Sequence, residues 1–375
     1  MTVNLRGNSG RAQFMRRYWQ REPLLIRGAF PGFADPLSPR EIFALASRDD
    51  AVSRLVVHRA RKWSVEHGPI PASRFKQLPR RDWTVLVQDT NHFCAAAREV
   101  LASFDFIPHA RIDDVMVSYA APGGGVGPHV DSYDVFLLQG RGRRRWSISR
   151  QRDLAFVPGL ELKILARFRP EQEWVLEAGD MLYLPPGVAH HGVAESECLT
   201  WSIGFRAPSD EELVQGFLDF LRDRMAPSGH YRDPGEAPAR HPGAIPPRLV
   251  HHAGKALQSI RWSDREILSF AGRFLSEPKQ HVYFTPPARP ASRAQFERRA
   301  LREGLSLDPR SRLVFSGTMF FMNGDDMAVA PAARAAMRKL ADRRRLDAGM
   351  KAPREFWDLA HDAYLRGFVT LGEAT

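Results

Sequence analysis

The stretch from Gly127 to Trp146 reads GPHVDSYDVFLLQGRGRRRW and combines residue types that bind metals and anions. His129 and Asp131 are two residues apart at the head of an apolar segment. In an extended chain, residues i and i+2 point to the same side, so both side chains aim at one point. Two imidazoles and one carboxylate hold ferrous iron on one face and leave the opposite face open. A surface His–Asp pair is the commoner origin of this motif when it occurs alone, so the metal hypothesis needs a second histidine.

That second histidine is found about 60 residues later, in the stretch GDMLYLPPGVAHHG. MLYLP predicts a strand and PPG a turn, and His190 and His191 follow directly. A turn before a ligand lets the chain direct an imidazole to a site built elsewhere. From spacing alone the two histidines are nearly equal candidates. Such nitrogen and oxygen ligands suit Fe(II) and Mn(II), and zinc also accepts them.

The three consecutive arginines that follow the apolar segment predict an anion site. If Trp146 and Ile148 face the core, the two-residue period of a strand places Arg144 on the same side. A buried guanidinium needs a partner, and no acid occupies the matching local position. A bound carboxylate is therefore expected, and a dicarboxylate such as 2-oxoglutarate would reach from the metal to Arg144. The alternative is a structural arginine paired with a backbone carbonyl or a distant acid.

Two serines in otherwise apolar strands are further candidates for co-substrate binding. Ser118 is in DDVMVSYA and Ser202 is in LTWSIGFR. Either hydroxyl could hydrogen-bond the co-substrate carboxylate. A hydrogen bond within the sheet is at least as good an explanation, above all for Ser202.

The elements that must position these residues are mainly strands. Residues 53–206 contain many short β-type segments separated by Gly and Pro, which predicts an antiparallel sandwich or barrel. Ser38, Pro39 and Glu41 begin a capped helix over 38–48. After Pro208 the pattern becomes helical, and we expect helices over 209–225, 249–259 and 262–275. Residues 226–247 are rich in Pro and Gly and predict a loop.

The last 85 residues predict a small separate module. The pattern is a helix over 292–303, a hairpin at RLVFSG and MFFMNGDD, and helices over 331–344 and 353–363, which is compatible with a winged helix. We therefore divide the chain into a barrel (1–207), a helical dimerisation segment (208–285) and a winged-helix-like domain (286–375).

Composition limits the class of protein. A chain of 375 residues with 43% hydrophobic residues is long enough for two or three cores. Cys94 and Cys198 cannot form a disulfide framework, which favours a reducing compartment. We find no secretory leader and no apolar run of about 18 residues, so we expect a cytoplasmic protein without membrane contact.

The sequence resembles the bacterial JmjC-type ribosomal oxygenases of the cupin superfamily (the RoxA/YcfD group). The resemblance is carried by DDVMVSYAAPGGGVGPHVDSYDVFLLQGRGRRRW, GDMLYLPPGVAHHG and LTWSIGFRAPS, and it covers residues 10–207. It implies a double-stranded β-helix barrel, dependence on Fe(II) and 2-oxoglutarate, and hydroxylation of one arginine on large-subunit ribosomal protein sixteen. It also implies a homodimer formed by the helices after the barrel and a C-terminal winged-helix-like domain.

By position, the resemblance places His129, Asp131 and His190 on the iron ligands, because the family's distal histidine follows PPGxx directly. It places Arg144 at the far carboxylate of 2-oxoglutarate and Ser118 at a co-substrate contact. The family often has an acid where this chain has His191.

The basic character of the chain raises a question about its partner. The net charge is +11, although the expected substrate is itself basic. An acid at the mouth would resolve the conflict; Asp134 is one candidate, but a surface role suits it better. The basic exterior also predicts weak electrostatic contact with ribosomal RNA.

Two other classes of protein remain open on this evidence. A cupin that binds or isomerises a small acid with Zn or Mn would use the same Arg144. A nucleic-acid-binding module would need the basic helix at RKLADRRR (338–345), which is more often a solvated helix face.

Overall fold

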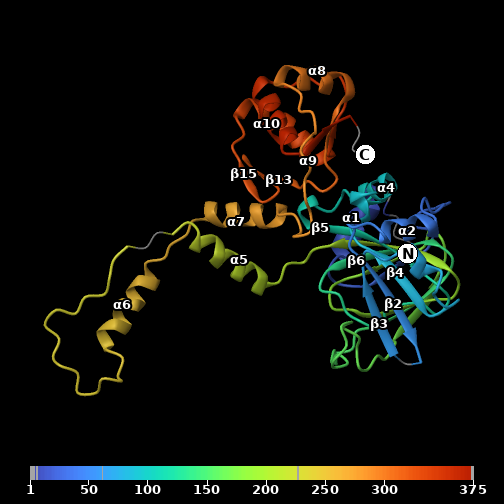
Figure 1. The fold of residues 1–375 in the computed structure, drawn as a ribbon, viewed down its shortest axis with the longest axis horizontal. Helices are drawn as coiled ribbons and strands as arrows, with labels where there is room; N and C mark the ends of the chain where they lie inside the picture. Colours follow the sequence, from blue (N-terminus) through green and yellow to red (C-terminus); the bar gives the residue numbers. More distant parts are fainter. Residues whose placement is uncertain (1–4, 6, 61, 226–227, 373–375) are drawn as a thin grey trace.

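The structure, a computed structural model, describes Leu5 and residues 7–60, 62–225 and 228–372. Within these residues, two antiparallel sheets pack against each other in the first part of the chain (Figure 1). The larger has the order β1-β9-β6-β11-β5-β4-β2-β3 and the smaller the order β10-β7-β8. Their bounds are β1 Leu24–Ile26, β2 Ser53–Arg59, β3 Lys62–His67, β4 Trp83–Val87, β5 Ile112–Ala120, β6 Asp134–Arg141, β7 Arg144–Ser149, β8 Gln172–Leu176, β9 Met181–Leu184, β10 Ala189–Ala194 and β11 Cys198–Phe205.

The larger sheet is apolar on both faces, which is why its central strands are almost continuously hydrophobic. Along β6, Phe136 and Leu138 point to an outer core, whereas Val135 and Leu137 point toward the smaller sheet. Trp146 contributes to the same inner core from β7. The site residues therefore lie between the sheets, where side chains of both sheets meet.

Short helices cover the outer face of the larger sheet. They are α1 (Asn8–Arg17), α2 (Pro39–Ala46), α3 (Ala72–Phe75) and α4 (Ala95–Ala102), with 3-10 turns η1 (Thr90–His92) and η2 (His109–Arg111). Phe14 of α1 and Ile42 of α2 are fully buried in the outer core. The predicted cap of α2 is confirmed, because the Ser38 hydroxyl accepts from the backbone N–H of Glu41.

Three helices follow the sheets: α5 (Asp210–Arg222), α6 (Pro247–Gln258) and α7 (Asp264–Ser276). These bounds confirm the expected helices to within a few residues. Helices α5 and α7 pack together, with the rings of Phe217 and Phe270 5.3 Å apart. Figure 1 shows α6 projecting away from the rest of the chain, and none of its residues is buried.

The C-terminal part has its own hydrophobic core. Its elements are α8 (Arg293–Glu303), β12 (Leu305–Leu307), β13 (Leu313–Ser316), β14 (Met319–Met322), β15 (Asp325–Met327), η3 (Pro331–Ala333), α9 (Arg334–Arg343), β16 (Arg345–Leu346), α10 (Arg354–Leu365) and β17 (Val369–Leu371). The predicted turn between β14 and β15 is present, and Asn323 and Gly324 have φ of 51° and 89°. A type I′ turn needs this left-handed conformation at both positions.

A cluster of charges joins the segment after α7 to the sheets. The ammonium nitrogen of Lys279 is 3.0 Å from an oxygen of Asp89, 3.2 Å from Asp113 and 3.6 Å from Asp114. The His281 ring nitrogen Nε2 is 2.9 Å from the other oxygen of Asp89. One cation thus bridges three acids of the barrel. No helix in the described part of the chain is long and apolar enough to cross a membrane.

Candidate metal centre

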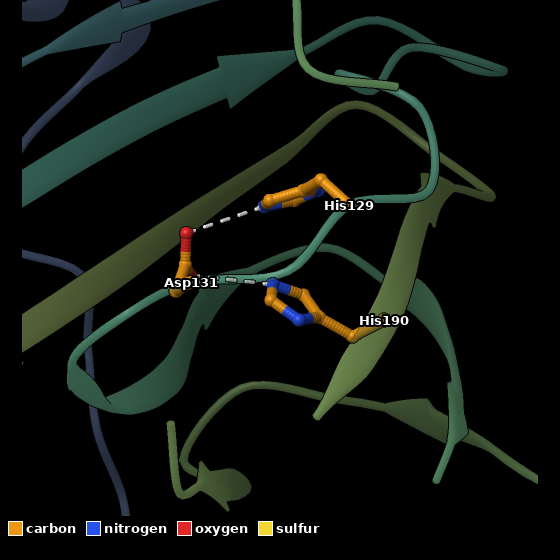
Figure 2. Close-up of side chains that lie close together, drawn as sticks. All are labelled: His129, Asp131 and His190. Carbon is orange, nitrogen blue, oxygen red and sulfur yellow. Dashed lines mark ion pairs between the residues drawn. The ribbon is translucent and has the colours of Figure 1, made fainter. Parts of the chain in front are cut away.

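Three side chains from two segments converge between the sheets (Figure 2). Ligand atoms of His129, Asp131 and His190 all lie within 4.8 Å of one another. His129 Nε2 is 3.9 Å from one oxygen of Asp131, and His190 Nε2 is 3.5 Å from the other. Two nitrogens and a carboxylate thus face a common point.

The backbone brings these segments together through a single β-bridge. His129 and His190 exchange hydrogen bonds, with N···O distances of 3.0 Å and 2.9 Å. The N–H of Gly187, in the PPG turn, donates to the carbonyl of Asp131 at 2.8 Å. The expectation that HVD heads a regular strand needs correction, since β6 begins only at Asp134. HVD pairs with β10 instead, and its two-residue spacing still aims both side chains at one point.

Hydrogen bonds select the tautomer of both histidines. Nδ1 of His129 lies 3.0 Å from the Gly127 carbonyl, and Nδ1 of His190 lies 3.0 Å from the Val188 carbonyl. A carbonyl can only accept, so each Nδ1 carries the proton and each Nε2 keeps its lone pair. Burial, assisted by the neighbouring His129, lowers the pKa of His190 to about 4. The ring is therefore neutral at physiological pH, as a metal ligand must be.

His191 does not join this cluster. Along β10, His190 pairs with Ile148 and His191 pairs with Ser147, so the two rings lie on opposite faces of the smaller sheet. The His191 ring packs against Phe168, with ring centroids 6.1 Å apart. The alternation of side chains along β10 thus distinguishes His190 from His191, which the spacing in the sequence had left as nearly equal candidates for the metal ligand.

Arg144 is buried on the inner face, as its two-residue phase with Trp146 predicted, and it is only 4% exposed. Its guanidinium donates from Nη2 to the Gly192 carbonyl at 3.2 Å. Among the described residues, Arg144 forms no ion pair with a carboxylate, and its Nε has no hydrogen-bond partner. Burial lowers its pKa from the ordinary value. An unneutralised buried cation with an unused donor fits a bound anion.

Two hydroxyls lie close to the Arg144 guanidinium, and the sequence had named one of them, Ser118, as a candidate. Nη1 of Arg144 lies 3.5 Å from the Ser118 hydroxyl and 3.4 Å from that of Thr200. Ser202 is buried two residues further along β11, and no hydrogen bond joins it to Arg144 in the described contacts. Sequence reasoning missed Thr200, although it occupies the same strand phase as Ser202.

Asp134 does not serve the mouth, and its expected surface role is wrong. Its side chain is fully buried. It accepts hydrogen bonds from the Tyr183 hydroxyl at 2.6 Å and the Gln20 amide at 3.0 Å, and it pairs with Arg111 at 3.1 Å. These contacts tie the chain after α1 and the 3-10 turn η2 to the sheet.

Comparisons with known proteins agree with this geometry. Residues 99–213 match the JmjC domain model and residues 259–370 match the ROXA-like winged helix model. The chain is 36% identical over 278 residues to the ribosomal protein uL16 3-hydroxylase of Escherichia coli, covering 74% of each chain. It is 40% identical over 210 residues to a probable ribosomal oxygenase of Haemophilus influenzae, covering 54% of this chain and 51% of that one.

Solved structures give the same result. The structure of E. coli YcfD, a ribosomal oxygenase, in complex with cobalt and 2-oxoglutarate matches with a TM-score of 0.83 and 31% identity, covering 99% of both chains. Another structure of E. coli YcfD gives a TM-score of 0.83 over 99% of this chain. The chain therefore belongs to the JmjC ribosomal oxygenases, which are 2-oxoglutarate-dependent hydroxylases. The predicted fold class, a JmjC barrel followed by a winged helix, is confirmed.

Proposed function

We propose that this chain hydroxylates an arginine side chain of large-subunit ribosomal protein uL16, using Fe(II) and 2-oxoglutarate. The observation that carries the proposal is the pairing of the His129–Asp131–His190 cluster with the buried, unneutralised Arg144 on one inner face. The curated relative is named a uL16 3-hydroxylase, and the related structure holds cobalt and 2-oxoglutarate.

In this proposal the two Nε2 atoms and the Asp131 carboxylate hold Fe(II), and Arg144 receives the far carboxylate of 2-oxoglutarate. Ser118 and Thr200 orient the guanidinium, and we assign Ser202 only to the wall of the pocket. Bound Fe(II) and 2-oxoglutarate would supply the electrons that activate dioxygen, which is the oxidant of the reaction. The chain contributes geometry and a water-poor pocket. The apolar core between the sheets, beside this site, includes Val135, Leu137, Trp146, Ile148, Leu182 and Leu184.

A cationic substrate requires an acid at the mouth, and we propose Asp114. The two-residue phase of β5 places Asp114 and Ser118 on the same inner face. Ser118 is beside Arg144, so Asp114, four residues earlier in β5, lies toward the opposite end of this strand from Arg144. Tyr133, two residues after Asp131, has its pKa raised well above its usual range by burial, with the carboxylates of Asp131, Asp114 and Asp113 adding to the shift. The carboxylate of Asp114 also lies 3.6 Å from the Lys279 ammonium nitrogen. The shared strand face and the influence on Tyr133 support Asp114 as the acid that meets the substrate.

The test is turnover with defined components. Purified protein with Fe(II), ascorbate and 2-oxoglutarate should release succinate and add one oxygen atom to a uL16 peptide, located by mass spectrometry on an arginine. The matched control is the same peptide with that arginine replaced by lysine. Metal binding without peptide oxidation or succinate release would favour instead the cupin that binds or isomerises a small acid with Zn or Mn.

We further propose a homodimer formed by residues 208–285, between a barrel (1–207) and a C-terminal domain (286–375). Apolar side chains on α5 and α6 are exposed, including Leu218 at 60% and Leu257 at 69%. A helix such as α6 gains little stability without a packed apolar face. A second copy of this chain would cover these residues.

We also propose a cytoplasmic location and weak electrostatic contact with ribosomal RNA. The net charge of +11 supports the contact, as do the exposed Arg338, Lys339 and Arg343 of α9. Binding to ribosomal particles should weaken steeply as salt is raised. Cosedimentation that is independent of salt would contradict this part of the proposal.

A further inference from the structure

Trp146 carries a buried hydrogen-bond donor that the described residues leave unpaired. The side chain is 4% exposed, and its indole Nε1 has no hydrogen-bond partner. Buried donors in folded proteins almost always have an acceptor, which is a protein group, an ordered water or a ligand. This donor therefore marks a place where an acceptor is expected.

The indole lies between the two ends of the proposed co-substrate site. Its ring is 4.8 Å from the guanidinium carbon of Arg144 on one side. On the other side, its centroid is 5.9 Å from that of the His190 ring. Arg144 and Trp146 share the inner face of β7. A diacid that reaches from the metal cluster to Arg144 must pass this ring.

Gly192 shows how the indole is turned. A Cβ atom added to Gly192 would lie 2.7 Å from both Cη2 and Cζ3 of Trp146. These atoms form the end of the ring remote from nitrogen. The benzene edge therefore covers Gly192, and the nitrogen-bearing edge points away from β10. Nothing larger than glycine leaves the ring in this position.

We propose that the indole N–H of Trp146 donates a hydrogen bond to the diacid held between the metal cluster and Arg144. A second unpaired donor, Nε of Arg144, lies on the same face and also lacks an acceptor. Arg144 Nε lies beside the benzene edge of Trp146, so the two unused donors approach the inner face from different points. An elongated anion that accepts several hydrogen bonds, such as a diacid, could meet both. The inference rests on the proposed function, because it requires that 2-oxoglutarate binds here.

The first test observes this N–H directly. The chain has eight tryptophans, so a spectrum of indole ¹H–¹⁵N pairs is simple, and the Trp146 resonance is the one absent from Trp146→Phe. In wild-type protein loaded with Zn²⁺, which does not support turnover, 2-oxoglutarate should shift this resonance more than the other indole resonances. A resonance that stays in place while 2-oxoglutarate binds would overturn the inference.

The second test measures affinity. Trp146→Phe removes the N–H and retains an aromatic ring over Arg144. Loss of a hydrogen bond to a charged acceptor should raise the Kd for 2-oxoglutarate about tenfold or more, measured by calorimetry on the Zn²⁺-loaded protein. Trp174→Phe is the matched control, because Trp174 is the half-buried cross-strand partner of Trp146 on β8. The Kd of this variant for 2-oxoglutarate should equal that of the wild-type protein.

The two proposals fail in different ways. If wild-type protein with Zn²⁺ does not bind 2-oxoglutarate, the proposed function is wrong. If wild type binds it and Trp146→Phe binds it equally well, only the role of Trp146 is wrong. Should Trp146→Phe not fold, the response of the indole resonances in wild-type protein still decides, with the Trp146 resonance assigned by its proximity to the His190 ring.

Discussion

At the scale of the residue, two backbone carbonyls decide whether the metal site can form. Each accepts the Nδ1 proton of a histidine, so each Nε2 presents its lone pair to the same point as the Asp131 carboxylate. Partners of this kind fix ring orientation and tautomer in metal sites generally. They come from the chain itself, at Gly127 and Val188, two residues before each histidine.

The adjacent histidines offer a matched pair of variants. His190→Ala should lose Fe(II) binding and turnover, because it removes one of three ligands. His191→Ala should keep both, because its ring lies on the other face of the strand. Metal content and succinate release measure the two effects. Equal loss in both variants would contradict the assignment of His190.

Arg144→Ala should raise the KM for 2-oxoglutarate at least tenfold, since charged hydrogen bonds contribute about 1.5–3 kcal/mol each. Arg144→Lys should give an intermediate value, because lysine keeps the charge and loses the planar fork. Iron content should stay at the wild-type level in both. An unchanged KM would show that another group receives the far carboxylate.

Asp114 predicts a pH dependence of substrate binding. Burial, opposed by Lys279 and increased by Asp113 and Asp89, raises the pKa of Asp114 to about 7. Only the carboxylate attracts a guanidinium, so the KM for the uL16 peptide should fall as pH rises through about 7. In Asp114→Asn this KM should be about tenfold higher or more and lose that dependence. Asp113 is on the opposite face of β5 and raises the pKa of Asp114, so Asp113→Asn should move this dependence to lower pH without raising the KM at high pH. A KM at high pH that rises as much as in Asp114→Asn would contradict the assignment of Asp114.

The sequence predicted the ligand types and the buried arginine, because two-residue spacing is a direct property of extended chain. It could not separate His190 from His191, since that requires knowing how β10 pairs with β7. Thr200 was missed as a neighbour of Arg144 for a related reason: apolar strands give no sign of which hydroxyl lies beside a particular guanidinium. The strand period did place Trp146 on the face of Arg144, but it did not indicate that the indole N–H lacks an acceptor.

At the scale of the element, the close approach of β10 to β7 determines the surroundings of the Arg144 guanidinium. Gly192 provides the carbonyl that Arg144 contacts and the space that Trp146 occupies. Helix bounds were predictable because capping residues mark them, as at Ser38 and Ser209. The β-bridge between the HVD segment and β10 was not predictable from the sequence, because a single bridge between distant segments has no local sequence signal.

Gly192→Ala tests this packing. The added methyl would lie 2.7 Å from Nε of Arg144 and from the Trp146 ring, so the side chains must move. We expect a loss of about 1–3 kcal/mol in the free energy of unfolding and weaker 2-oxoglutarate binding. Gly254→Ala, on the exposed α6 with nothing within 4 Å, should be neutral or slightly stabilising. Denaturant unfolding measures both; a stable Gly192→Ala with normal affinity would contradict the packing argument.

At the scale of the whole molecule, the proposed dimer depends on the exposed helices between the two hydrophobic cores. Leu257→Glu, on the exposed apolar face of α6, should shift the protein from dimer to monomer in light scattering coupled to gel filtration. The matched change Lys255→Glu, on the same helix, should leave the mass unchanged. A wild-type protein that is monomeric at micromolar concentration would refute the proposed dimer.

The bridging lysine after α7 has a practical consequence for anyone who prepares the catalytic part alone. A recombinant fragment ending at Ser276 would retain every strand of both sheets. It would lack Lys279, the only cation of the described residues that lies within 4 Å of Asp89, Asp113 and Asp114 together. Without that lysine, mutual repulsion of the three carboxylates would favour the uptake of protons. Such a fragment should fold better in mildly acidic buffer than at neutral pH, so extending it past His281 is the sounder design.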